Sequence, residues 1–177
     1  MKRKLIWALT LAVVGVAVYG GTAMATPPSG VSNPPWSPVV GRFQGGIDTT
    51  AKTDLDPGIA TDFWKVDITA KGATDVHVVE NIFAPGGTFG WHSHPGPSLV
   101  IVKSGTLSVY HGADCTSSQE YGPGSPLGST FVDGGHDVHM VRNNTTVVDE
   151  VYVVSFVPAG FARRIDEPNP DPGVCPN

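Results

Sequence analysis

Glycine and proline interrupt this chain so often that long helices are nearly excluded. The 177 residues include 22 Gly and 16 Pro, and both residue types disfavour the interior of a helix. Stretches longer than about ten residues show no convincing helical period of apolar residues without a Gly or Pro inside them. Collagen is excluded as well, because glycine does not recur at every third position. The core must therefore come from short, non-helical elements.

Short runs of β-branched and aromatic residues recur between these breaks and predict strands. Turn residues separate the runs, as in Pro85-Gly86-Gly87 and Asp133-Gly134-Gly135. Many short strands at regular spacing are typical of an all-β sandwich or barrel. The last run is apolar on both faces, which predicts a central or covered strand. The expected strands span residues 63–70, 76–84, 98–103, 106–111, 129–132, 137–142 and 146–157.

The first 25 residues have the layout of a secretory signal peptide. A basic start from Lys2 to Lys4 precedes an apolar stretch from Leu5 to about Gly20, and small residues flank Met24 in Ala23-Met24-Ala25. We expect cleavage after Ala25, a secreted, extracellular protein, and no stable membrane span afterwards. A retained anchor is the alternative, because the apolar stretch is almost long enough to cross a bilayer.

Composition divides the exported part into three segments. Residues 26–60 are rich in proline and predict an extended leader that lies over the domain or is partly disordered. Residues 61–160 hold the predicted strands, and residues 161–177 form a polar, proline-rich tail that we expect at the surface. In an oxidising compartment Cys115 and Cys175 predict one disulfide, with two free thiols as the alternative. The bond would clamp the tail to the body and stabilise the fold by about 4 kcal/mol.

The charge of the chain argues against one class of partner. Eleven Lys and Arg residues stand against 16 Asp and Glu residues, a formal net charge of −5. Nucleic-acid binding requires a basic face that releases counterions from phosphates. We therefore expect no nucleic-acid partner.

One pair of histidines points to chemistry. His92 and His94 are separated by one residue, so in an extended strand both imidazoles point to the same face. Two neutral imidazoles on one face can begin a site for a divalent transition metal. The pair alone is a weak signal, because surface histidines often show this spacing.

The surrounding residues resemble the two motifs of the cupin superfamily. The first motif runs Gly, five residues, His-x-His, three or four residues, Glu, six residues, Gly; the second runs Gly, five residues, Pro-x-Gly, two residues, His, three residues, Asn. Residues 86–143 carry the resemblance, and the strand pattern extends it to about residues 61–160. It implies a single antiparallel jelly-roll β-barrel and, by analogy alone, a homodimer. The residues that fit are Gly86, His92, His94 and Gly105 in the first motif and Gly128, His139 and Asn143 in the second.

The chain also departs from these motifs. Ser98 stands at the Glu position, and Gly134 and His136 replace the Pro and Gly of the second motif. The resemblance then implies a metal site of three histidines, His92, His94 and His139, as in cupin branches such as the thiol dioxygenases. Iron, manganese, nickel, copper and zinc all accept imidazole, so the sequence does not identify the metal.

Three neutral imidazoles would leave the full +2 charge on the metal centre and favour anionic or chelating ligands. We expect Ser98 to contact the cofactor region, where its hydroxyl would hydrogen-bond a water or substrate held by the metal. No carboxylate is fixed beside the histidines by the sequence.

The other polar and aromatic residues near the motifs have simpler interpretations. His136 is expected in a turn or behind the ligands, and Asn143 in a structural role. Trp91 should face away from the imidazoles and pack. Glu80 could reach the cavity or lie on a solvated face, and surface or core placement is the default for His77 and His111.

Two functions fit this pattern. One is a secreted enzyme of the dioxygenase type, because a site with three ligands leaves room for a small-molecule substrate and O₂. The other is a module that binds a metal or small ligand without turnover, since one fold hosts many functions. A structural protein of the cell wall, without metal, is a third and weaker interpretation.

Overall fold

The computed structural model describes residues 24–56, 58, 59 and 61–177. The predicted signal peptide lies outside these residues except for Met24 and Ala25. Every regular element in the described part is a strand, which confirms the all-β prediction. The strands are β1 (Ser29–Ser32), β2 (Val39–Phe43), β3 (Gly46–Asp54), β4 (Phe63–Lys71), β5 (Thr74–Ser93), β6 (Ser98–Ser104), β7 (Leu107–His111), β8 (Asp114–Tyr121), β9 (Thr130–Asp133), β10 (His139–Arg142), β11 (Asp149–Pro158) and β12 (Ile165–Asp166).

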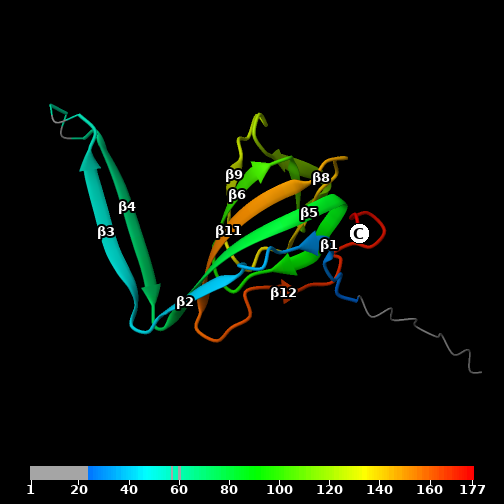
Figure 1. Ribbon diagram of the computed structural model, residues 1–177, viewed down its shortest axis with the longest axis horizontal. Coiled ribbons are helices and arrows are strands. Elements are labelled where there is room, and N and C mark those ends of the chain that lie inside the picture. Colours follow the sequence, from blue (N-terminus) through cyan, green and yellow to red (C-terminus); the bar gives the residue numbers. More distant parts are fainter. Residues whose placement is uncertain (1–23, 57, 60) are drawn as a thin grey trace, which may run out of the picture.

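The strands β5 to β11 form an antiparallel jelly-roll barrel (Figure 1). Hydrogen-bonded neighbours follow the order β8-β7-β10-β5-β11-β6-β9. The central β11 lies between β5 and β6, as the apolar pattern of both its faces predicts. Its alternate residues from Asp149 to Val157 are buried, so one face of the strand lines the core.

One prediction is wrong at β5, a strand of 20 residues that pairs with two other strands of the barrel. We expected Pro85-Gly86-Gly87 to reverse the chain, but β5 continues through it. The strand pairs with β11 before this point and with β10 after it. A Cβ on Gly87 would lie 2.5 Å from the carbonyl oxygen of Gly30. Glycine thus permits β1 to cross closely over a bend rather than forming a hairpin turn.

The core fills the interior of the barrel with branched aliphatic and aromatic side chains. Phe83 packs edge-on against Phe89, with ring centroids 4.9 Å apart. These side chains come from β5, β6, β7, β10 and β11, so burial joins strands that are distant in sequence. The fully buried members of the cluster are Val79, Phe83, Val100, Val102, Leu107, Val109, Val141, Val151 and Val153.

The segment between residues 26 and 60 contributes three strands. β1 and β2 pair with β5 and so lie against the barrel. Arg42 on β2 makes two hydrogen bonds to Asp75 on β5, at 2.6 and 2.7 Å, and this guanidinium holds the pKa of Asp75 well below its usual range. The part of the leader that forms β1 and β2 therefore lies over the domain.

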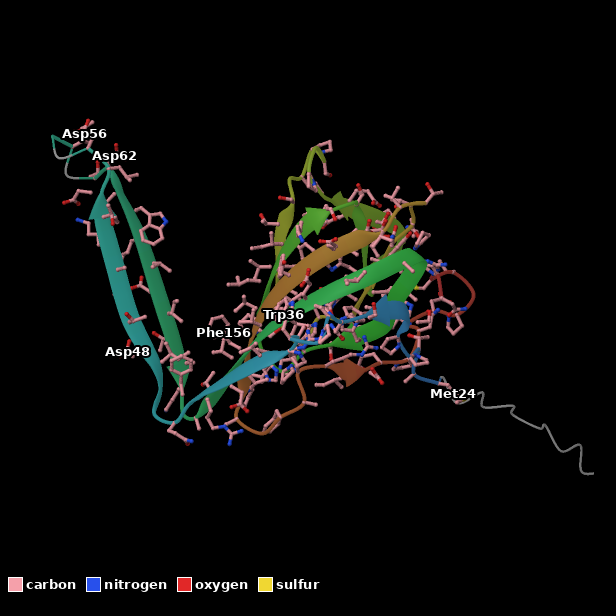
Figure 2. All side chains as sticks on the ribbon, viewed as in Figure 1. Met24, Trp36, Asp48, Asp56, Asp62 and Phe156 are labelled. Atoms are coloured by element: carbon pink, nitrogen blue, oxygen red, sulfur yellow. A yellow bond between two sulfur atoms is a disulfide. The ribbon has the colours of Figure 1, made fainter. Side chains whose placement is uncertain are left out.

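The third of these strands, β3, pairs with β4 in a separate two-stranded sheet. This hairpin projects from the barrel as a long arm (Figures 1 and 2). Residues 63–70 are thus a strand, as predicted, but they pair with the arm and not with the barrel. Phe63 and Trp64 are exposed on it.

The disulfide between Cys115 and Cys175 confirms that prediction, with Cα atoms 5.2 Å apart. It lies with Trp91 and Met140 in a second buried cluster. The indole nitrogen of Trp91 donates to the carbonyl oxygen of Pro176 at 2.9 Å. The tail is therefore fixed to the barrel by a covalent bond, by packing and by strand β12, which pairs with β5.

Within the described residues, no helix has the length and hydropathy needed to cross a membrane.

Candidate metal centre

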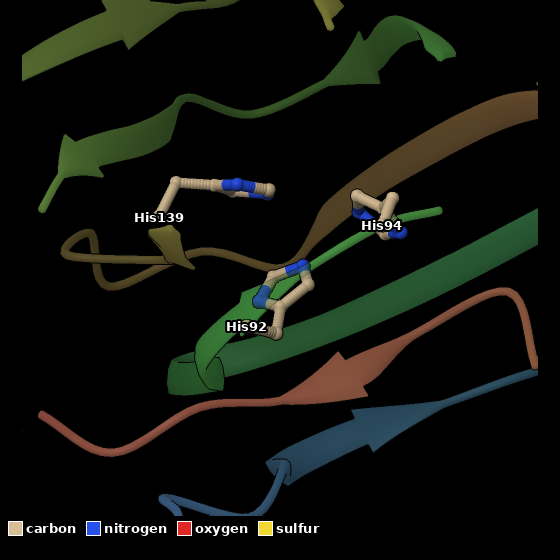
Figure 3. A group of neighbouring side chains, drawn as sticks. All are labelled: His92, His94 and His139. Carbon is tan, nitrogen blue, oxygen red and sulfur yellow. The ribbon is translucent and has the colours of Figure 1, made fainter. Parts of the chain in front are cut away.

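The barrel brings the three predicted histidines together. His92 on β5 and His139 on β10 are cross-strand partners, and His94 follows β5 by one residue. Facing side chains of paired strands lie on the same side of a sheet. The ring centroids are 4.3 Å apart for His92 and His139 and 4.9 Å apart for His92 and His94. Figure 3 shows the three rings gathered in one region from the two strands.

Backbone carbonyls fix the tautomer of each ring. The Nδ1 atoms of His92, His94 and His139 lie 2.9, 2.6 and 2.9 Å from the carbonyl oxygens of Gly90, Arg163 and Asp137. A carbonyl oxygen can only accept, so each Nδ1 carries the hydrogen. In a neutral ring of this tautomer, Nε2 carries the lone pair and is the atom that can bind a metal. Orientation by a carbonyl is the usual support of a histidine that binds metal.

Burial favours the neutral form of His92 and His139. The rings of His92, His94 and His139 are all nearly fully buried. Burial is the main cause that lowers the pKa of His92 well below the usual 6.5, and the neighbouring His139 adds to it. Burial also lowers the pKa of His139, against the opposing effect of Asp133. Because metals bind the neutral imidazole, these shifts suit the rings for ligation at neutral pH.

The ligand atoms of the three histidines lie within 4.8 Å of one another. Three inward nitrogen donors with their opposite nitrogens already hydrogen-bonded form a set that fits a divalent transition metal. The structure thus supports the three-histidine group as a place that can hold such an ion, and it does not identify the metal.

A carboxylate lies beside the histidines that we did not predict. Oδ2 of Asp133 lies 3.0 Å from Nε2 of His94 and 3.1 Å from Nε2 of His139. Burial alone would raise the pKa of Asp133, whereas its contacts with His94 and His139 hold that pKa below the usual 3.8. Asp133 is therefore an anion at neutral pH. The sequence suggested only a turn here, because Asp133 precedes two glycines.

Ser98 lies where the motif places it, on the wall of the same cavity. It is buried, and its hydroxyl lies 2.8 Å from the hydroxyl of Ser155 on β11. A contact between Ser98 and a ligand remains a prediction.

The remaining residues near the motifs lie outside the histidine group. His136 is exposed in a turn with φ of 49°, and its backbone N–H donates to the carbonyl oxygen of His94. Asn143 is buried, and its side-chain amide donates to the carbonyl oxygens of Phe83 and Val147. These contacts hold a loop in place, which fits the structural role that we expected. Trp91 packs on the opposite face of β5, as predicted.

The three other residues named from the sequence also lie away from the histidine group. The carboxylate of Glu80 faces the ammonium group of Lys103 and not the cavity. The ring of His111 contacts Asp137, and His77 is half-buried.

Two arginines of the tail complete the cavity. Arg163 and Arg164 line it together with the histidines, Ser98 and Asp133. Burial lowers the pKa of both arginines, and the charge of Arg164 lowers that of Arg163 further. The free volume for the centres of water-sized molecules is about 30 Å³, enough for a very small ligand. The tail, expected only at the surface, thus supplies positive charge to the site.

The strand pairing and the in-register histidines decide the fold. The two motif segments lie on adjacent strands of one jelly-roll barrel, with their histidines facing each other. The chain therefore has the jelly-roll fold that its resemblance to the cupins implies.

Solved structures of cupins and related double-stranded β-helix proteins resemble parts of this chain. A cupin-like protein from Thermotoga maritima is 14% identical over 70% of this chain and 78% of its own, with a TM-score of 0.44. A double-stranded β-helix protein from Klebsiella pneumoniae is 19% identical over 52% of this chain and 75% of its own, with a TM-score of 0.42. An oxalate oxidase with bound glycolate is 28% identical over 47% of this chain, with a TM-score of 0.39.

The chain spans 42% of the length of that oxalate oxidase. Because all of these TM-scores are below 0.5, the fold assignment rests on the strand order and histidine positions of this chain. No protein-family model and no curated protein matches the sequence significantly.

Proposed function

We propose that this protein binds one divalent transition metal through His92, His94 and His139. The observation that carries the proposal is the shared tautomer. Three buried rings each donate Nδ1–H to a backbone carbonyl, and their ligand atoms lie within 4.8 Å of one another. A bound metal would act as a Lewis acid or redox centre for a small molecule.

The ligand class that we propose is a small anion with oxygen or sulfur donors. Arg163 and Arg164 are half-buried on the cavity wall, and Arg164 also pairs with Asp166 at 2.6 Å. A guanidinium favours a carboxylate partner. The volume of about 30 Å³ suits a molecule of a few heavy atoms. The chain would orient such a ligand between the arginines and the histidine group.

The activity that we propose is that of a dioxygenase, in which both atoms of O₂ enter the organic product. The test loads the purified protein separately with Fe(II), Mn(II), Ni(II) or Cu(II) and supplies small thiols, hydroxy acids and catechols. We expect O₂ consumption with at least one pair, and ¹⁸O₂ should place two labelled atoms in the products. Unchanged O₂ across the panel with metal bound would contradict the enzymatic proposal.

The second candidate is a binding module that holds metal and ligand without turnover. The narrow cavity favours it, since substrate and O₂ would have to share about 30 Å³ unless the wall moves. This candidate predicts tight metal and anion binding with no product. Secretion through the signal peptide and assembly as a homodimer also remain predictions.

A further inference from the structure

The arm formed by β3 and β4 is an amphipathic sheet with an exposed apolar face. Side chains alternate across a strand, and the register of β3 with β4 places all six charged residues of these two strands on one face. The opposite face consists of uncharged side chains. Trp64 and Ile68 on it are 52% and 37% exposed. The residues of this apolar face are Ile47, Thr49, Ala51, Thr53, Trp64, Val66, Ile68 and Ala70.

Such a hairpin needs support from another surface. A sheet of two strands is marginally stable in water by itself, and packing of its apolar face against a further layer stabilises it. The charged face has ion pairs of its own, since Lys52 pairs with Asp54 at 3.1 Å and Lys65 with Asp67 at 2.9 Å. The apolar face is therefore the side of the arm that a second surface would cover.

A second exposed apolar surface crosses the outside of the barrel. One residue from each of five neighbouring strands forms a row in which each member is the cross-strand partner of the next. The two ends of this outer row, Val132 and Val39, are 65% and 54% exposed. Exposed apolar surface that continues over several strands marks a contact with another molecule. In order across β9, β6, β11, β5 and β2, the outer row is Val132, Leu99, Val154, Val78 and Val39.

The arm stands apart from the outer row of its own chain. It joins β2 through residues 44–45 and β5 through residues 72–73, and Figure 1 shows it projecting away from the barrel. A groove with a free volume of about 590 Å³ lies between residues 66–71 of the arm and the barrel wall, where Leu99 and Phe156 line it. Figure 2 shows Phe156 on the side of the barrel that faces the arm. A single chain therefore leaves both apolar surfaces exposed.

Two copies of the chain would cover both surfaces at once. In a two-fold arrangement the same contact forms twice, because the arm of each copy meets the outer row of the other. A nine-residue hairpin is about 30 Å long and about 10 Å wide, so two arms and the surfaces beneath them would bury about 1,200 Å² in total, the lower end of the range for stable interfaces. Both surfaces are uncharged, so their contact buries no unpaired charge.

We propose that the arm is a dimerisation element whose apolar face packs on the outer row of a second copy of this chain. The arm of each copy crosses β6, β9 and β11 of the other, and its charged face stays in solvent. The proposal depends on the arm and the outer face of the sheet and not on the histidine group, so it goes beyond the proposed metal function. It gives the homodimer that we expected by analogy a specific interface.

The first test changes each surface and measures the mass of the assembly by light scattering. Ile68→Lys charges the apolar face of the arm, and its control Thr69→Lys adds the same charge to the opposite face, beside Asp48. Leu99→Lys and Leu127→Lys form a second pair, because both leucines are exposed but Leu127 lies between β8 and β9, outside the outer row.

We expect twice the chain mass for the wild type and for both controls. Each test variant should raise the dissociation constant of the dimer at least about 30-fold, because a charge would replace a central apolar contact. A monomeric wild type, or a dimer that either test variant leaves unchanged, would overturn the proposal.

The second test uses the unaltered protein and its lysines. Lys52, Lys65 and Lys71 lie on the arm, whereas Lys103 lies on β6, the strand of Leu99. Equal amounts of ¹⁴N- and ¹⁵N-labelled protein are equilibrated until intact dimers of mixed isotope form, and a long amine-reactive reagent then cross-links them. We expect mixed-isotope peptides that join Lys103 to an arm lysine. If Lys103 is joined to the arm only within one isotope, the arm closes on its own barrel and the proposal is wrong; absence of any such peptide would contradict it too.

Discussion

His92 and His139 are paired across two adjacent strands although 46 positions separate them in the sequence. The register of β5 with β10 places one imidazole directly opposite the other, with centroids 4.3 Å apart. His94, two residues after His92 and just beyond the end of β5, adds the third imidazole. The group is thus held by the backbone hydrogen bonds of a sheet, and a rigid support of this kind suits metal binding.

The tail arginines should decide the affinity for anions. Arg163→Gln and Arg164→Gln each remove one positive charge from the cavity wall, so each should weaken acetate binding by about tenfold. The measurement is a spectral titration of the Co(II)-loaded protein with acetate. Lys71→Gln is the control, because it removes an equal charge from the exposed arm. Acetate affinity that falls as much in the control would show a general charge effect.

Asp149 should make stability depend on pH. It is buried next to Gly105, and burial raises its pKa from 3.8 to about 6. Between about pH 4 and 6 the folded state therefore binds more protons than the unfolded state, so stability falls as pH rises through this window. Asp149→Asn removes the charge and should raise Tm relative to the wild type by roughly 3 °C at pH 7.5.

The same variant provides its own control at low pH. At pH 4 Asp149 is protonated in the folded wild type, so most of the difference in Tm should disappear. The histidines titrate in both proteins and cancel in the comparison. A difference in Tm that is the same at both pH values would contradict the assignment of the shift to this carboxyl.

The disulfide should contribute much of the stability. Cys115 and Cys175 close a loop with a sequence separation of 60, and on the chain-entropy model such a bond stabilises the folded state by about 4 kcal/mol. Cys115→Ser with Cys175→Ser should lower the free energy of unfolding in urea by this amount. The wild type in reductant should approach the same value. Unchanged stability in both would mean that packing around Trp91 fixes the tail by itself.

The projecting arm should be dispensable for metal binding. β3 pairs only with β4, while the ends of β2 and β5 already face each other as Phe43 and Thr74. Removing residues 46–71 leaves a four-residue loop, a common hairpin connection. We expect Co(II) affinity within about twofold of the wild type, since ligands and core remain. Loss of folded, metal-binding protein would show that the arm supports the barrel.

The strand period and the resemblance to two motifs together predicted the histidine group. One residue separates His92 from His94, and in a strand this spacing fixes a common face. His139 was predicted through the resemblance of its surroundings to the second motif. The strand register then confirmed that the rings lie together. These are short-range patterns, which a linear sequence displays directly.

The parts that the sequence did not predict depend on pairing between distant segments. Asp133 precedes two glycines and suggests a turn, and only its register opposite Ser98 shows that it enters the cavity. Gly86 and Gly87 suggest a reversal, but the close approach of Gly30 makes them a bend within one strand. Arg163 and Arg164 seemed solvated because the course of the tail depends on the disulfide and on β12.

The central claim is that three imidazoles hold one metal ion, and metal content measures it directly. The purified wild type is exposed separately to Fe(II), Mn(II), Ni(II), Cu(II) and Zn(II), passed through a desalting column and analysed for metal. His92→Ala with His139→Ala is the test variant, and His111→Ala is the control, because His111 also pairs with His139 but its ring faces Asp137. We predict about one ion per chain in the wild type and control for at least one metal, and far less in the test variant. Wild-type protein that retains none of the five metals, or a test variant that retains as much as the control, would contradict the account.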